Sequence, residues 1–423
     1  MRVLTARWVF PVAGPPILDG AVAIAAGEIA AVGRREEIES AWPEAARSDL
    51  GQAAVLPGLV NCHTHLEIAP LPASQSAEAF VTWVIRLIET RRTFSAEEQS
   101  RAAEAGVQAL LRSGTTTVGE VTTAGRSLAP LLRAGLRGVV YRELVGLPPD
   151  EAGERAEGAR IEIEAMCAAA FGSRIRIGLS PHSPYALSEA LLSACGGLVE
   201  ETGVPPAIHA AESPEEVEYL AHGSGPIPRL LYPAVGCADP PPRGFAESPV
   251  AYLAACGVLA WRPLLIHAVH VTDRDCETMA RHGVGVAHCP RSNARLSRGT
   301  APVPRFLARG IPVGLGTDSL GSVPSLDLWD EMRAALAVHG GRLDPSTVLE
   351  MATLGGAGVL GMADCVGSLE TGKRADLIAV STRGITVAEP IGSLLRGTSA
   401  ADVLCSLIDG ELRYAHPEVP VCV

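Results

Sequence analysis

The stretch VLPGLVNCHTHLEIAP, residues 55–70, ends an apolar run with two histidines one residue apart. After the turn residues Pro57 and Gly58, the short apolar run LVNC has the length and composition of a buried strand. Side chains two positions apart on a strand point to the same face. His63 and His65 are therefore predicted to reach one common atom at the end of a strand.

Five further apolar runs end in a histidine or an aspartate: RIRIGLSPH at His182, PPAIH at His209, PLLIH at His267, GVGVAH at His288 and IPVGLGTD at Asp318. Helical segments separate such runs, and one of them opens with the capping-box pair Ser95 and Glu98. Strands alternating with helices over roughly 300 residues predict an α/β fold, a (β/α)8 TIM-like barrel. In such a barrel all strand C-termini share the face on which active sites are built.

The two chain ends have a different sequence pattern. Segments such as DGAVAIAAGEIAAVG and VGSLETGKRADLIAVS indicate short strands joined by tight turns. This pattern predicts that residues 1–56 and 366–423 form two parts of one small β-sandwich. Residues 57–365 are then left for the barrel.

Composition excludes several classes of partner. The 423 residues carry 47 acidic and 35 basic side chains and a net charge of −12, which argues against nucleic acid and anionic membranes. Ten scattered cysteines without a C-x-x-C pair indicate reduced thiols. No signal-peptide core is seen, and no apolar run approaches the ~20 residues that span a bilayer. We expect a cytoplasmic protein with a small-molecule substrate. Dimers are common among symmetric assemblies, and a homodimer is expected on that general ground alone.

The strand-end residues have the chemistry of a metal site. A single histidine after a strand is usually structural, but six such ends in one chain favour a converging site. Two imidazoles from His63 and His65, a third from His209 and the carboxylate of Asp318 form a donor set suited to zinc or iron.

Several motifs carry a resemblance to a known family: PGLVNCHTH, SPHSPYALS, IHAAES, LLIHAVHVTDRD, VAHCPRSNARLSRGTAPVPRFLARGIPVGLGTDS and VGSLETGKRADLIAV. They resemble the amidohydrolase superfamily, in particular its branch of nucleoside deaminases and chlorohydrolase-like enzymes, over nearly the whole chain. The resemblance implies one divalent metal ion, zinc in first place and iron as the alternative, held by His63, His65, His209 and Asp318. It also implies a hydrolase of carbon–nitrogen bonds in cyclic amidines, in which a metal-bound hydroxide attacks the ring and ammonia leaves.

The same resemblance implies roles for neighbouring residues. Glu212, three residues after the third ligand, matches the proton shuttle, and Asp318 accepts a proton from water. His267 orients the hydroxide and the tetrahedral oxygen, with His270 as the alternative, while His182 holds the substrate ring.

Two further points concern the metal shell. Members of the superfamily with two metals bridge them through a carboxylated lysine, and the only lysine here, Lys373, lies outside the predicted barrel. A one-metal site remains. His288 is expected to support either the metal shell or the substrate.

The segment after the H-x-H motif bears on the substrate. The HTHLE…F-x-x-W version resembles enzymes that deaminate 6-aminodeoxyfutalosine for menaquinone biosynthesis. Glu67 is then expected to bind a hydroxyl or the ring, Trp83 to form an apolar wall and Arg142 to meet the substrate carboxylate. For Trp83 helix packing, and for Arg142 a salt bridge to a neighbouring acid, are the alternatives.

Other functions remain open at this stage. Deamination of S-adenosylhomocysteine, methylthioadenosine or adenosine is a close alternative, and hydrolysis of aminated or chlorinated triazine or pterin rings is a more distant one. A non-catalytic binding protein would be expected to lack a ligand or the acid, and none is missing.

Overall fold

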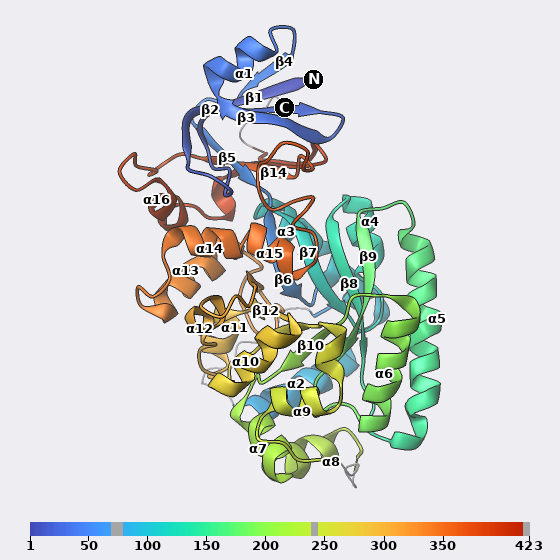
Figure 1. The fold of residues 1–423 in the computed structure, drawn as a ribbon. Helices are drawn as coiled ribbons and strands as arrows, with labels where there is room; N and C mark the ends of the chain where they lie inside the picture. The colour runs from blue at the N-terminus through green and yellow to red at the C-terminus, as the bar shows by residue number, and fades with distance from the viewer. Residues whose placement is uncertain (69–78, 238–243, 418–423) are drawn as a thin grey trace.

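The structure, a computed structural model, describes residues 1–68, 79–237 and 244–417. Three β-sheets and the helices around them make up the described part (Figure 1). One sheet is built from strands of both chain ends and is called the terminal sheet here. The other two are parallel four-stranded sheets from the middle of the chain, so the predicted α/β fold with parallel strands is confirmed.

The terminal sheet has eight strands in the order β16-β15-β14-β5-β1-β2-β3, with β4 paired to β1. Its strands are β1 (Arg2–Val9), β2 (Ile17–Ala25), β3 (Glu28–Arg34), β4 (Ala46–Asp49), β5 (Ala53–Pro57), β14 (Leu377–Ser381), β15 (Val403–Ile408) and β16 (Glu411–Ala415). The two chain ends meet where β5 pairs antiparallel with β14, Val55 opposite Ala379. These pairings join both ends in one sheet; they do not define the two packed layers of the expected sandwich.

The two parallel sheets have the orders β6-β7-β8-β9 and β10-β11-β12-β13. Their strands are β6 (Leu59–Thr64), β7 (Thr115–Thr122), β8 (Arg137–Leu144), β9 (Ile175–Pro181), β10 (Ala207–Ala210), β11 (Leu264–His267), β12 (Gly285–His288) and β13 (Val313–Leu315). Isolated parallel bridges connect the sheets at both edges, Leu179 to Pro206 and Thr64 to Asp318.

Helices flank these strands (Figure 1). They are α1 (Arg35–Ala41), α2 (Phe80–Thr93), α3 (Ala96–Arg112), α4 (Leu128–Ala134), α5 (Ala152–Ala170), α6 (Glu189–Thr202), α7 (Pro214–His222), α8 (Tyr232–Ala234), α9 (Pro249–Ala255), α10 (Asp273–His282), α11 (Pro290–Arg295), α12 (Val303–Leu307), α13 (Leu328–His339), α14 (Pro345–Met351), α15 (Leu354–Val359) and α16 (Pro390–Gly397), with short helical turns at Pro149–Glu151, Ile227–Leu231 (η2), Val258–Trp261 and Ala400–Asp402. No helix in the described ranges is long and apolar enough to cross a membrane.

The start of α3 follows from its sequence. The Ser95 hydroxyl accepts a hydrogen bond from the Glu98 backbone N–H at 3.2 Å, and the Glu98 carboxylate accepts from the Ser95 N–H at 2.8 Å. The predicted capping box is therefore present. It satisfies two backbone donors that the first helical turn leaves free.

The parallel strands are buried on both faces, which explains their continuous apolar runs. One apolar cluster takes side chains from six of them: Val60, Val121, Val139, Ala207, Ile266 and Ala287. Its members therefore face a common interior. With the strands fixed around that interior, the polar residues at their C-terminal ends are brought together.

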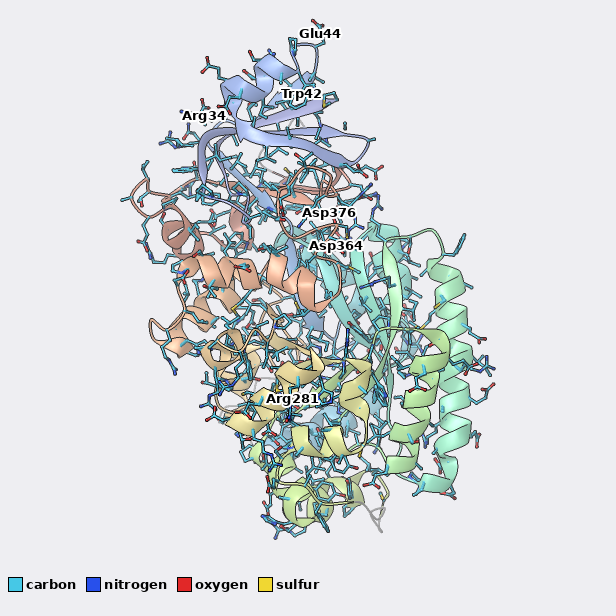
Figure 2. The ribbon with its side chains drawn as sticks, viewed as in Figure 1. Arg34, Trp42, Glu44, Arg281, Asp364 and Asp376 are labelled. Atoms are coloured by element: carbon cyan, nitrogen blue, oxygen red, sulfur yellow. The ribbon has the colours of Figure 1, made fainter. Side chains whose placement is uncertain are left out.

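A buried ion-pair network joins the terminal sheet to the parallel strands. Arg137, at the start of β8, donates from Nε to Asp376 at 2.7 Å and from Nη2 to Asp409 at 2.7 Å. Only 12% of the Arg137 side chain and 1% of the Asp376 side chain are exposed. Asp376 lies where the terminal sheet meets the rest of the molecule (Figure 2).

Removing Arg137 should destabilise this junction, because the buried carboxylate of Asp376 would lose its cation, whereas Asp409 keeps ion pairs with Arg174 and Arg374. We expect Arg137→Met to lower the free energy of unfolding by about 3 kcal/mol, measured by urea denaturation. Arg101→Ala is the matched control, since its ion pair with Glu97 is exposed on both sides, and it should change stability by less than about 0.5 kcal/mol. Equal effects of the two variants would contradict a structural role for the network.

Candidate metal centre and active site

His63 and His65 project from the end of β6 into a buried polar cluster. The exposed fractions are 1% for His63 and 8% for His65. Neither ring nitrogen of His63 has a hydrogen-bond partner in the described chain. Burial lowers the pKa of His63 to about 3, so the imidazole is neutral and its lone pair is free at neutral pH.

His209, at the end of β10, completes a set of three imidazoles. Its Nε2 lies 3.4 Å from Nε2 of His65, and its Nδ1 lies 3.0 Å from the backbone oxygen of His182. A hydrogen bond from Nδ1–H to that carbonyl directs the lone pair of Nε2 toward His65. Burial and the surrounding histidines hold the pKa of His209 well below its usual value.

Asp318 adds a carboxylate from the segment after β13. Its Oδ1 lies 3.7 Å from His63 Nε2, while Oδ2 accepts from the Ser292 hydroxyl at 2.6 Å and the Ser322 hydroxyl at 3.0 Å. Burial opposes ionisation, but the neighbouring histidines outweigh it and hold the pKa of Asp318 well below its usual range. The carboxylate of Asp318 is therefore ionised at neutral pH.

Local backbone features bring β6 and Asp318 together. Thr317 N–H and Asp318 N–H both donate to the His63 carbonyl at 3.0 Å. At Gly316 an added Cβ would lie 2.9 Å from the Cβ of His63, so only glycine permits this approach. Asp318 and His267 have left-handed backbones, with φ of 62° and 72°, a conformation that costs non-glycine residues on the order of 1–3 kcal/mol and clusters at active sites.

These residues fit a divalent metal ion. One ligand atom from each of His63, His65 and His209 lies within 4.8 Å of the others. Asp318 supplies an anionic oxygen beside them, which completes a set of three nitrogens and one oxygen. A bound cation would satisfy the ring nitrogens of His63, which have no hydrogen-bond partner among the described residues.

Glu212 and His267 lie next to this cluster. His267 Nε2 is 3.0 Å from Glu212 Oε1, and His267 Nδ1 is 2.9 Å from the side-chain oxygen of Asn293. Burial disfavours the charged form of His267, but contacts with Cys289, Asp318 and Asn293 outweigh it and raise its pKa. His270 instead contacts the Arg298 carbonyl through Nε2 at 2.7 Å, so of the two candidates it is His267 that meets Glu212.

The turn that carries Glu212 is held by a second buried carboxylate. Glu216 accepts hydrogen bonds from the backbone N–H groups of Ala211 at 2.9 Å and Glu212 at 2.8 Å. Ala211 has a left-handed backbone, with φ of 54°. This turn fixes the direction in which the Glu212 side chain leaves the end of β10.

His182 lies beside the imidazole cluster and is held by Glu143. His182 Nδ1 is 2.8 Å from Glu143 Oε1, and the ring centroids of His182 and His209 are 4.9 Å apart. Burial opposes ionisation of Glu143, but its contacts with His182, His65 and Arg91 outweigh burial and hold its pKa well below the usual range. Ligand atoms of Glu143, His182 and His209 also lie within 4.8 Å of one another, so a second metal arrangement shares His209.

Two residues expected to bind substrate have other contacts. Both carboxylate oxygens of Glu67 accept backbone N–H groups of the turn after β7, from Thr123 at 3.1 Å and Arg126 at 2.6 Å among others. Arg142 forms an ion pair with Glu162 of α5, the alternative weighed for it above. Neither residue lines the cavity described next, so neither is retained as a substrate contact.

A cavity of about 780 Å³ opens at the strand ends. Site residues from the strand ends and the loops after them line one part of it: His65, His182, His209, Glu212, His267, Arg298 and Asp318. Apolar side chains from α2 and from the turns after β8 and α7 line another part: Phe80, Trp83, Val84, Leu87, Ile88, Leu147, Leu231 and Val235. Arg91, Arg92 and Arg155 also border the cavity, and Trp83 lies on its wall.

Sequence reasoning missed Glu143, Asn293 and Arg298. Glu143 follows Arg142 on β8, and consecutive strand residues point to opposite faces; the structure turns Glu143 inward and Arg142 toward α5.

His288 is buried with its ring 5.4 Å from that of His339, and it does not line the cavity.

Comparison with known proteins agrees with this geometry. The sequence profile described as "Amidohydrolase family" matches residues 54–412. The chain belongs to the amidohydrolase family.

Named relatives in the family resemble this amidohydrolase over most of its length. It is 34% identical over 404 residues to the 5-methylthioadenosine/S-adenosylhomocysteine deaminase of Syntrophobacter fumaroxidans, covering 93% of this chain and 87% of the relative. It is 34% identical over 370 residues to the aminodeoxyfutalosine deaminase of Deinococcus radiodurans, covering 85% and 86%. A zinc-bound adenosine deaminase structure from Xanthomonas campestris aligns with a TM-score of 0.83 at 25% identity, covering 99% and 94%.

The expected family and class of reaction are thereby confirmed. The protein is a hydrolase acting on carbon–nitrogen bonds, and its relatives place it among the adenine-nucleoside deaminases. Members of the family depend on metal ions, and the histidine cluster supplies ligands for a divalent one.

The two overlapping metal arrangements predict different effects of substitutions on zinc binding. If His63, His65 and His209 hold the ion, His65→Ala should weaken zinc binding by about 100-fold or more, whereas Glu143→Gln should retain one zinc ion per chain. Metal content after dialysis, measured by plasma mass spectrometry, tests this. The exposed His222 provides the control His222→Ala, and loss of zinc from Glu143→Gln with retention in His65→Ala would contradict the assignment.

Proposed function

We propose that this amidohydrolase is a metal-dependent hydrolytic deaminase of an adenine nucleoside, with 6-aminodeoxyfutalosine as its leading substrate. The observation that carries the proposal is the position of Glu212, buried against His267 beside the cluster of His63, His65 and His209 and open to the cavity. A proton-transfer group is thus placed next to a metal site, in a cavity large enough to admit a nucleoside.

The proposal includes the architecture around the site. We infer that the two parallel sheets form one (β/α)8 barrel over residues 57–365, with the chain ends packed as a small β-sandwich. The parallel bridges at Thr64–Asp318 and Leu179–Pro206 support this, because they lie at the two edges where the sheets must join. One zinc ion, or iron, would then be held on the barrel's C-terminal face by His63, His65, His209 and Asp318.

The chemistry supplied by such an ion is acidification of water, from a pKa of ~15.7 toward ~7. Asp318, one of the residues that would hold the ion, is ionised and would be placed to accept a proton from water there. His267, bonded to Asn293 on one side and Glu212 on the other, is oriented to stabilise the oxygen that develops negative charge.

Glu212 moves the proton on the substrate side. Its Oε1 is engaged by His267 and Arg298, and no hydrogen bond reaches Oε2 from the described residues. Oε2 is therefore the oxygen that can carry a proton to the ring nitrogen and then to the departing amine. His182, fixed by Glu143, is positioned to hold the ring.

The wider cavity supports a substrate larger than adenosine. The apolar wall of α2, including Trp83, continues to Arg91 and Arg92 at the end of that helix, and neither arginine has an ion-pair partner in the described part of the chain. A nucleoside with an apolar arm that ends in a carboxylate would complement this surface. Aminodeoxyfutalosine has such an arm, with the arginines of α2 in the place first expected for Arg142.

A second candidate substrate is S-adenosylhomocysteine or methylthioadenosine. The deaminase of Syntrophobacter fumaroxidans, named for both compounds, is as similar in identity as the aminodeoxyfutalosine deaminase of Deinococcus radiodurans. Hydrolysis of triazine or pterin rings would use the same metal and proton-transfer residues, but it would not need the apolar wall of α2 or the arginines at its end.

Ammonia release by the zinc-loaded enzyme should distinguish these substrates. We expect kcat/KM for aminodeoxyfutalosine to exceed that for S-adenosylhomocysteine, methylthioadenosine and adenosine by at least about 10-fold, because only that arm is both aromatic and anionic. Preference for S-adenosylhomocysteine would select the second candidate. No activity on any of the four with zinc bound would contradict the nucleoside assignment.

A variant of the proton carrier supplies the control for this assay. Glu212→Gln keeps the shape of the side chain but cannot carry the proton, so it should bind zinc normally and lose about 100-fold or more in kcat. The exposed Glu218 on α7 gives the matched variant Glu218→Gln, which should retain full activity.

A further inference from the structure

Arg298 is a buried cation at the active site whose role the sequence does not reveal. It follows α11, and 1% of its side chain is exposed. Its Nη1 donates to Glu212 Oε1, and its guanidinium carbon lies 4.9 Å from the Phe80 ring centroid and 5.2 Å from that of Trp83. Burial lowers the pKa of Arg298 to about 10, which leaves the group charged at neutral pH.

The contacts of Arg298 leave donors unused. Nε and Nη2 are both buried, and neither has a hydrogen-bond partner in the described residues. Buried charged donors are almost always paired in folded proteins, since an unpaired one costs its full desolvation penalty. The ion pair with Glu212 uses only Nη1, and the rings of Phe80 and Trp83 fix the plane of the guanidinium. Because Arg298 lines the cavity, a bound ligand can supply the missing acceptor.

We propose that Arg298 is a substrate-binding residue that donates hydrogen bonds from Nε and Nη2 to a nitrogen acceptor of the substrate ring. The proposal rests on the proposed function, because the acceptors concerned are those of adenine. With Glu212 at N1, the ring acceptors that remain are N3 and N7. The guanidinium of Arg298, held in place by its ion pair with Glu212, donates a charge-assisted hydrogen bond to either N3 or N7.

The test compares a nucleoside that the enzyme deaminates with its 3-deaza and 7-deaza analogues, each lacking one ring acceptor. kcat/KM is measured for wild type, Arg298→Met and Arg298→Lys. Arg298→Met should lower kcat/KM for the parent nucleoside by about 10- to 100-fold. It should also reduce the penalty for one of the two analogues by about the same factor, since the contact that the analogue lacks is already gone. Arg298→Lys, which keeps the charge without the planar fork, should fall between the two.

Controls separate this role from a structural one. Arg295 is exposed on the same segment, and Arg295→Met should change neither kcat/KM nor the analogue penalties. Zinc content and the unfolding midpoint check that each variant is folded; if Arg298→Met is not, Arg298→Lys carries the same comparison. Analogue penalties equal to those of wild type would overturn the role of Arg298 and leave the proposed function standing. A wild type inactive on every adenine nucleoside would instead overturn the proposed function, and this role with it.

Discussion

Three neutral imidazoles meet at one buried point, and the rest of the active site is arranged around them. Their ligand atoms lie within 4.8 Å of one another, and neither ring nitrogen of His63 has a hydrogen-bond partner among the described residues. Desolvating so many nitrogens is unfavourable unless a cation or a shared proton compensates for it. The ionised Asp318, the hydrogen bond that orients His209 and the serine hydroxyls on Asp318 all favour a cation at this point.

Much of the inner site could be predicted because it depends on rules that the sequence displays. Parallel strands end at one edge, so His63, His65, His209, His267 and Asp318 converge once the strands are recognised. His267, favoured over His270 because it ends the apolar run, lies on the strand and contacts Glu212, whereas His270 contacts the Arg298 carbonyl. Likewise, Ser95 and Glu98 predicted the start of α3 from adjacent residues alone.

The remainder depended on information that the sequence does not display. Strands buried on both faces lose the alternation that separates inside from outside, so Arg142 and Glu143 could not be told apart as inward and outward residues. Glu67 was expected at the substrate because it follows the H-x-H motif, yet its carboxylate is taken up by backbone N–H groups 56 or more residues away. Arg298 reaches Glu212 across 86 positions from a segment without regular structure, and no periodicity indicates such a contact.

The metal and proton-transfer site and the rest of the cavity are built from different parts of the chain, as is usual for enzymes with parallel strands. Residues at strand ends form the metal and proton-transfer site, whereas α2 and the turn at η2 line the rest of the cavity with apolar side chains and, at the end of α2, with Arg91 and Arg92. Phe80 and Trp83 connect the two parts, since they border the wider cavity and also pack against the guanidinium at Glu212. The outer part of the cavity and the ion pair of Glu212 are thus in physical contact through one helix.

The central claim is that a single divalent ion is bound at the end of β6. Anomalous diffraction at the zinc absorption edge, from crystals of the zinc-loaded enzyme, tests it most directly. The account predicts one peak per chain, coordinated by His63, His65, His209 and Asp318. A peak between Glu143, His182 and His209, or two peaks in the cavity, would contradict it.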